Sequence, residues 1–282
     1  MSDDGNAVTR PRSGRGRRLR WLAATLALVV MAAVFALPAL HRRILFPRPT
    51  PRDVVPPAGV SWLRIPASDG SIVHALHRPA ETGSPTLAYF HGNGEQLADI
   101  VDLVAWYGET GVGMLAVEYP GYGRASAESP SEPAFYAAGH AAIDYLQRNL
   151  QVPHAQTVLM GYSIGAGTAT EMARRGLGAR LVLVSPFTSV AAMTRRLMPF
   201  LPARLFVRDH FDNAAKAAHI TMPTFIAHGD RDLLIPIAMS RSLASLFPHA
   251  SLLAIHGAGH PDVFLRGGDD LRHRIAAFAR GR

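Results

Sequence analysis

The sequence predicts an α/β fold, in which a mostly parallel sheet of about eight strands is flanked by helices and carries a small helical cap. Two observations predict it. The first is that short apolar runs alternate with longer amphipathic ones from Ser61 onward. The second is that these apolar runs have the length and composition of buried strands. A third observation adds a separate element, because the 20 residues 21–40 contain no charged side chain and are long enough for a membrane helix.

The amino terminus divides into three expected parts. Residues 1–20 form an arginine-rich tail, 21–40 a transmembrane helix or uncleaved signal anchor, and 41–60 an extended spacer rich in proline and arginine. Six arginines precede the apolar run and four follow it before position 53. This charge bias predicts a single-pass membrane protein with a cytoplasmic amino terminus and the bulk of the chain outside. A cleaved signal peptide and a buried core helix are the alternatives.

The net charge of +8 belongs to the amino terminus. Residues 1–52 carry ten arginines and two aspartates, whereas the rest of the chain holds 19 basic and 19 acidic side chains. The globular part has no excess positive charge with which to neutralise phosphates. No nucleic-acid partner is therefore expected.

The absence of cysteine and the presence of a single lysine exclude several classes of protein. Without cysteine the chain has no disulfide, no thiolate metal site and no catalytic cysteine. The lysine, Lys216, follows two alanines instead of a glycine-rich loop, which excludes a P-loop NTPase. We expect neither a cofactor nor a metal.

The globular part, residues 61–282, begins with an antiparallel hairpin around the turn Ser68-Asp69-Gly70 and continues with buried strands. The expected strands are Ser61–Ile65, Ser71–Leu76, Thr86–Phe90, Val112–Val117, Thr157–Met160, Leu181–Val184, Thr224–Ala227 and Leu252–Ile255. Apolar residues at helical spacing predict helices over about 96–110, 133–150, 164–175, 236–247 and 263–280. Residues 187–220 interrupt the alternation with short proline-bounded segments, and we expect them to form the cap.

A candidate nucleophile stands between an expected strand and the helix that follows it. The segment Gly161-Tyr162-Ser163-Ile164-Gly165 has the pattern Gly-x-Ser-x-Gly. A turn tight enough to project a serine hydroxyl crowds its neighbours, so the flanking positions must be glycine. In this context the pattern predicts Ser163 as a nucleophile, and a buried serine in a glycine-rich turn is the alternative.

A serine nucleophile needs a base that a carboxylate orients, and both should follow later strands. The two candidate loops are His228-Gly229-Asp230-Arg231-Asp232 and His256-Gly257-Ala258-Gly259-His260. We predict Asp232 as the acid, because Asp230 adjoins the strand end and is suited to cap the turn through its own backbone. We predict His260 as the base, because His256 sits at the strand tip and is better suited to a structural role.

The oxyanion that forms during acyl transfer needs two backbone N–H donors. One is predicted to be Ile164, the residue after the nucleophile. The other should come from the glycine-rich loop after the third strand, where Asn93 is the expected donor and Gly94 the alternative. His91, in the same loop, is expected to be a structural histidine that ties neighbouring loops together.

Six motifs in this order resemble the α/β-hydrolase superfamily. They are His91–Gly94, Glu118–Gly123, Gly161–Gly165, Ser185–Ser189, His228–Asp232 and Gly257–His260. More narrowly, the chain is similar to membrane-tethered α/β-hydrolase-domain serine hydrolases, which include depalmitoylating thioesterases and lysophospholipid lipases. The resemblance covers roughly residues 44–265. It implies the α/β-hydrolase fold, with Ser163 as nucleophile, Asp232 as acid and His260 as base.

The sequence thus predicts a serine hydrolase that cleaves carboxylic ester or thioester bonds of lipophilic acyl substrates through an acyl-enzyme. Its expected partners are a small-molecule or lipid acyl ester and the membrane, the latter contacted through 21–40. One alternative is a serine peptidase resembling the aminopeptidases, in which acidic groups near the cap would hold a free amine. The candidates for that role are Glu128, Glu132, Asp209 and Asp212. The other alternative is a membrane-tethered binding module without catalysis.

Overall fold

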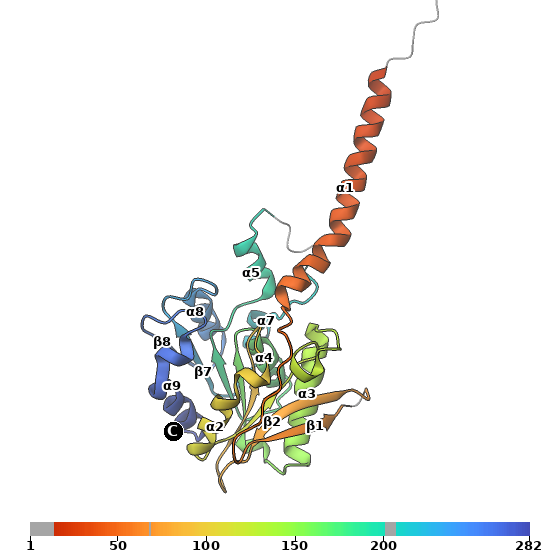
Figure 1. The fold of residues 1–282 in the computed structure, drawn as a ribbon. Helices are drawn as coiled ribbons and strands as arrows, with labels where there is room; N and C mark the ends of the chain where they lie inside the picture. Colours follow the sequence, from red (N-terminus) through yellow and green to blue (C-terminus); the bar gives the residue numbers. More distant parts are fainter. Residues whose placement is uncertain (1–13, 68, 201–206) are drawn as a thin grey trace, which may run out of the picture.

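The computed structural model describes residues 14–67, 69–200 and 207–282. In this part of the chain an eight-stranded sheet forms the centre of the molecule, with strand order β1-β2-β4-β3-β5-β6-β7-β8 (Figure 1). Its strands are β1 Ser61–Pro66, β2 Ile72–Arg78, β3 Thr86–Phe90, β4 Gly113–Val117, β5 Thr157–Tyr162, β6 Arg180–Val184, β7 Thr224–Gly229 and β8 Ala250–Ile255. β2 pairs antiparallel with β1 and β4, and the remaining pairs are parallel. The predicted mostly parallel sheet of about eight strands is confirmed.

The central strands are buried on both faces, as their continuous apolar runs predict. In β3, Leu87 and Tyr89 belong to one hydrophobic core, and Ala88 and Phe90 belong to the other. All four side chains have no solvent exposure. Successive side chains of a strand point to opposite faces, so the sheet separates two cores and needs helices on each side.

The helices supply those two layers. They are α2 Val101–Glu109, α3 Glu132–Arg148, α4 Gly165–Arg174, α5 Val190–Leu197, α7 Asn213–Ala217, α8 Ile237–Leu246 and α9 Val263–Ala279. Residues of α2 and α9 share one core with the sheet, and residues of α3, α4, α7 and α8 share the other. Short 3₁₀ turns occur at Leu97–Asp99, Gly123–Ala125 and His154–Gln156.

The amino-terminal helix α1 covers Gly14–Leu45 and projects away from the body (Figure 1). The extended spacer expected from position 41 is therefore wrong over its first five residues, 41–45, which continue the helix because arginine is a good helix former. Taken over the described part of the chain, none of the helices combines the length and the apolar character that crossing a bilayer requires. The prediction of a membrane span over 21–40 thus finds no support in the structure.

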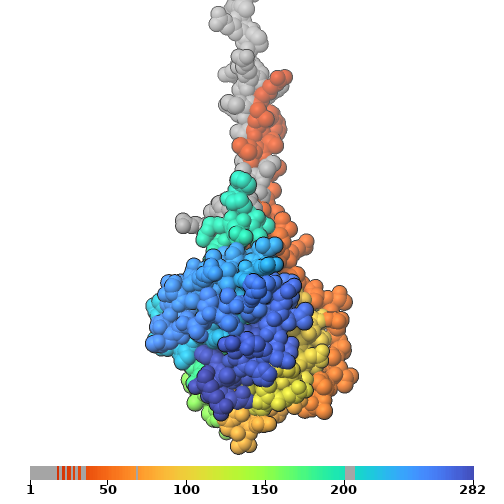
Figure 2. Space-filling model, turned by 90° about the vertical axis from the view of Figure 1, so that its left-hand side faces the viewer, coloured from red at the N-terminus to blue at the C-terminus, as the bar shows by residue number. Residues whose placement is uncertain are grey.

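Two helices, α5 and α7, lie in the segment where the cap is expected. A serine or aspartate begins each of them, since the side chains of Ser189 and Asp212 accept hydrogen bonds from the backbone N–H groups of Ala192 and Ala215. Figure 2 shows α1 and the α5 region rising from the same end of the body. Residues 201–206 of the predicted cap, residue 68 of the predicted hairpin turn and residues 1–13 of the predicted tail lie outside the described residues.

Candidate active site

Ser163 lies on the sharp turn between β5 and α4, at the carboxyl edge of the sheet. Its φ of 53° is in the left-handed region, which a non-glycine residue adopts only where the surroundings enforce it. A Cβ atom on Gly161 would lie 2.3 Å from the carbonyl oxygen of Gly165, and one on Gly165 would lie 2.0 Å from that of Phe90. The two glycines are thus needed for the close approach of this turn to its own helix and to β3.

A chain of hydrogen bonds joins Ser163, His260 and Asp232. His260 Nε2 lies 2.9 Å from Ser163 Oγ, and His260 Nδ1 lies 2.7 Å from Asp232 Oδ2. With Nδ1 donating to the carboxylate, Nε2 is the atom free to accept the serine proton. The structure therefore brings together the three residues that the sequence singles out from three separate loops.

Asp232 is buried and held by several donors. Its Oδ1 accepts hydrogen bonds from the backbone N–H groups of Leu234 and Ile235, at 2.9 and 2.8 Å. Burial alone would raise the pKa of this carboxyl group, but hydrogen bonds from His228, His260 and Ile235 outweigh it and hold the pKa well below its usual range. Asp232 is consequently a carboxylate at neutral pH, as an orienting group must be.

His228 is a buried part of this arrangement that sequence reasoning did not assign. Its Nε2 lies 2.7 Å from the carbonyl oxygen of Ile235 and 3.2 Å from Asp232 Oδ2, and its Nδ1 lies 2.6 Å from Ser240 Oγ. The histidine thus links the end of β7 to α8 behind the carboxylate. The only sequence signal for it is its place at the head of the motif that contains Asp232.

Tyr162 holds the loop that carries His260. The tyrosine hydroxyl donates to the carbonyl oxygen of His260 at 2.8 Å, and the two rings stack with centroids 5.5 Å apart. Tyr162 precedes the nucleophile, so one strand end positions both the serine and its base. Its contribution comes from a contact 98 residues away along the chain, which no local pattern reveals.

The loop after β3 faces the same space as the serine. Asn93 and Ile164, the predicted oxyanion donors, both line the cavity that contains Ser163. Glu95 fixes the turn of this loop by accepting the Gly92 N–H at 2.6 Å, and the side-chain oxygen of Asn93 accepts the Tyr122 hydroxyl at 2.9 Å. Burial raises the pKa of Glu95.

Two other histidine–carboxylate pairs occur near the site. His91 is fully buried with its Nε2 3.2 Å from Glu118 Oε1, which agrees with the structural role expected of it. Asp230 accepts the Gly257 N–H at 2.7 Å and lies 3.0 Å from His256 Nδ1. We expected Asp230 to cap its own turn through its own backbone, and this is wrong. Its carboxylate instead contacts His256 and Gly257, and so it ties the loop after β7 to the loop after β8.

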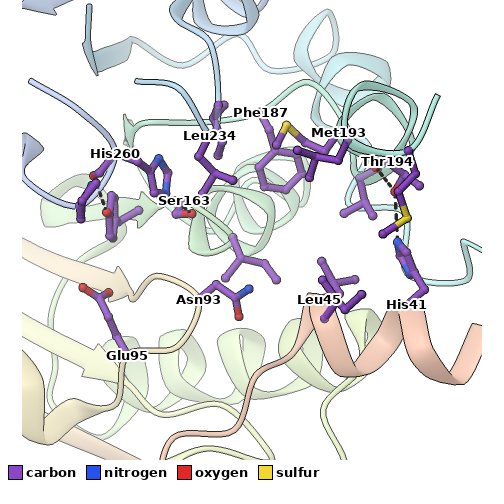
Figure 3. A pocket seen from close by; sticks show the side chains of 18 residues that line it. His41, Leu45, Asn93, Glu95, Ser163, Phe187, Met193, Thr194, Leu234 and His260 are labelled. Atoms are coloured by element: carbon purple, nitrogen blue, oxygen red, sulfur yellow. Dashed lines mark hydrogen bonds between the residues drawn. The ribbon is translucent and has the colours of Figure 1, made fainter. Parts of the chain in front are cut away.

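A cavity of about 430 Å³ opens beside Ser163 and His260 (Figure 3). Its walls come from the end of α1, the loop after β3, the turn between β5 and α4, the segment from Phe187 to the end of α5, and the loops after β7 and β8. Away from the polar residues at Ser163, most of the lining is aliphatic or aromatic, including Leu45, Phe187, Met193 and Leu234. Such a site offers an extended apolar substrate a place next to the serine hydroxyl.

The acidic residues considered as amine holders do not line this cavity. Glu132 accepts the backbone N–H groups of His210 and Phe211, and Asp209 accepts that of Glu132. Asp212 caps α7, and Glu128 lines a separate cavity of about 110 Å³. Among the described residues, no group of three or more His, Asp or Glu side chains is arranged to hold a metal ion.

Comparison with known proteins agrees with this architecture. The family model described as "Alpha/beta hydrolase family" matches residues 87–279. The chain is 28% identical over 265 residues to the Mycobacterium tuberculosis protein Rv2307c, an uncharacterized protein, with 91% of this chain and 93% of that protein covered. It is 31% identical over 190 residues to the alpha/beta hydrolase domain-containing protein aho-3 of Caenorhabditis elegans, covering 67% of this chain and 56% of that protein.

Among solved structures, the Pyrococcus furiosus esterase Pf2001 superposes with a TM-score of 0.68 at 17% identity, covering 83% of this chain and 97% of that chain. At this identity the likeness concerns the fold alone. The family model covers most of the globular part, including the strands β4 to β8 and all of β3 except its first residue. On this evidence the chain belongs to the alpha/beta hydrolase family.

Proposed function

We propose that this protein is a serine hydrolase that cleaves ester or thioester bonds of lipophilic acyl substrates. The observation that carries the proposal is the hydrogen-bonded chain from Ser163 through His260 to Asp232, at 2.9 and 2.7 Å, at the edge of an apolar cavity. A serine hydroxyl is a weak nucleophile until an adjacent base accepts its proton. Here the base, its orienting carboxylate and the substrate space adjoin one another.

The proposed reaction proceeds in two halves. His260 Nε2 takes the proton of Ser163 as Oγ adds to the carbonyl carbon, and the resulting oxyanion accepts hydrogen bonds from the backbone N–H groups of Ile164 and Asn93. Collapse of the intermediate breaks the bond to the alcohol or thiol, which leaves with the proton from His260. Water then attacks the acyl-enzyme in the same way and releases the carboxylic acid.

The lining of the cavity favours an acyl ester over an aminoacyl substrate. Its walls are largely apolar, and none of the four acidic residues considered as holders of a free amine lines it. Glu95 does line the cavity, but its carboxyl group accepts the Gly92 N–H at 2.6 Å and fixes the turn of its own loop. A free ammonium group needs a carboxylate partner when it is removed from water. We therefore favour a lipophilic acyl group over the amino-terminal residue of a peptide.

We further propose that residues 21–40 attach the enzyme to a membrane, with the amino terminus in the cytoplasm and the globular part outside. Support comes from the sequence, because the segment is an uncharged apolar run of 20 residues with arginines on both sides of it. Cell fractionation followed by protease protection tests this proposal. Recovery of the protein in the soluble fraction would contradict it.

The proposed activity is tested by labelling the detergent-solubilised protein with a fluorescent fluorophosphonate, alongside the variant Ser163→Ala. We expect labelling of the wild type, none of the variant, and a loss of ester hydrolysis by several orders of magnitude in the variant. Circular dichroism establishes that both proteins are folded. A folded wild type that neither reacts with the probe nor hydrolyses esters, or a fully active variant, would overturn the assignment.

A further inference from the structure

One wall of the cavity beside Ser163 comes from the amino-terminal helix. His41, Ile44 and Leu45, in the last two turns of α1, line the same space as Ser163 and His260 (Figure 3). The sequence indicates only a spacer at these positions. In the structure, a segment that follows the apolar run of α1 is thus part of the candidate substrate site.

This end of α1 is fixed to the body of the protein. Arg42 Nε lies 3.0 Å from Asp209 Oδ2, and Arg42 Nη2 donates to the carbonyl oxygen of Pro130 at 2.7 Å. Phe46, which directly follows the helix, is 4% exposed and packs against the ring of Phe135 with centroids 5.3 Å apart. The wall therefore has a defined position relative to the serine.

A polar pair lines the cavity on the side away from Ser163. His41 Nε2 lies 3.1 Å from Thr194 Oγ1, and this contact joins α1 to α5 (Figure 3). The Thr194 hydroxyl donates to the carbonyl oxygen of Val190 at 2.9 Å, so it accepts its bond from His41. Both side chains are buried. Between the pair and the serine, the walls are formed by apolar side chains, including Leu45, Phe187 and Met193.

We propose that the end of α1 and helix α5 together form an acyl-chain pocket, and that the His41–Thr194 pair sets the longest chain that the pocket accepts. This inference rests on the proposed function, in which the acyl carbonyl lies at Ser163. The chain would then extend between Leu45 and Met193 and end against the pair. The substrate class is an unbranched acyl ester or thioester of limited chain length.

The test measures kcat/KM of the full-length protein in detergent for p-nitrophenyl esters from acetate to palmitate. Two variants reduce the space, Thr194→Phe from α5 and Leu45→Trp from α1. One variant, Thr194→Ala, enlarges it. Arg195→Ala is the matched control, because Arg195 is the exposed neighbour of Thr194 on the same helix and does not line the cavity.

We expect the two filling variants to lower the ratio of long-chain to short-chain kcat/KM by about tenfold, and Thr194→Ala to move the optimum toward longer chains. Opposite shifts distinguish a chain-length limit from general damage, which lowers all rates together. An active enzyme whose chain-length profile is the same in every variant overturns the inference while leaving the proposed function intact. A wild type inert toward every ester and toward the fluorophosphonate overturns both.

Discussion

His91, in the loop that carries Asn93, forms a buried pair with Glu118, which follows β4. His91 Nδ1 lies 2.9 Å from the Gly92 carbonyl oxygen, so each ring nitrogen faces an acceptor. A protonated imidazole carries a hydrogen on both nitrogens and can therefore donate to both acceptors. Burial lowers the pKa of His91, but the hydrogen bond and charge of Glu118 outweigh it, and the net effect raises this pKa. The pair thus stabilises the loop most when the histidine carries its proton.

This arrangement predicts a pH-dependent stability. A histidine whose pKa is raised on folding contributes fully below its unfolded pKa of about 6.5 and loses that contribution as the pH rises through the folded value. The double variant His91→Gln/Glu118→Gln replaces both members by neutral amides. We expect the stability advantage of the wild type over this variant to shrink from about pH 6 to about pH 9, as measured by urea unfolding.

The control for this prediction is His256→Gln, since the His256 side chain is 91% exposed and stands beside Asp230 at the protein surface. Its difference from the wild type should change little over the same range. A wild-type advantage over the double variant that is constant with pH, or that grows as the pH rises, would show that His91 is neutral in the folded protein.

At the scale of elements, β7 and α8 are linked behind the loop that carries Asp232. His228, at the end of β7, lies 2.6 Å from Ser240 Oγ on α8, and both side chains are buried. Ser240→Ala leaves a buried ring nitrogen without this partner, and we expect it to lower the free energy of unfolding by about 1–3 kcal/mol. Ser242→Ala, at an exposed position of the same helix, should change it by less than about 0.5 kcal/mol. Equal effects of the two variants in urea unfolding would refute a role for this link.

The strands were predictable because each is specified by its own residues. The run Thr86–Phe90 predicts β3 with its observed bounds, since five consecutive buried positions suit only a central strand. β5 extends two residues beyond its predicted end at Met160, because Gly161 and Tyr162 also pair with β6. The sequence did not indicate this, since a glycine weakens the pattern of a strand. The carboxyl ends of parallel strands meet at one edge, which is why loop motifs far apart in sequence indicated one site.

The contacts that complete the site were not predictable, because they join segments with no shared pattern. Tyr162 supports His260 across 98 residues, and His41 reaches Thr194 across 153. The end of α1 was misjudged for a related reason. Hydropathy indicates where an apolar run stops, whereas arginine is a good helix former and lets the helix continue to Leu45.

At the scale of the whole molecule, Arg42 and Phe46 join the end of α1 to the body, and their neighbours His41, Ile44 and Leu45 border the cavity. Attachment of this helix and the shape of the site are therefore coupled. Asp209 is central to the junction, because its buried carboxylate contacts Arg42 through one oxygen and the Glu132 N–H through the other. Removing the arginine leaves that carboxylate buried without its cation. A buried charge that loses its partner destabilises the folded state.

We therefore expect Arg42→Met to lower the free energy of unfolding by about 1–3 kcal/mol, less than the loss for a fully buried pair because the Arg42 side chain is 37% exposed. For a protein of this size the loss corresponds to a fall in Tm of several degrees. Arg43→Met is the matched control, since Arg43 is exposed on the same helical turn. If α1 and the body form one unit, Arg42→Met alone should also speed proteolytic cleavage between α1 and β1. Equal Tm values and cleavage rates for the two variants would mean that the helix is joined to the body by other contacts, Phe46 foremost among them.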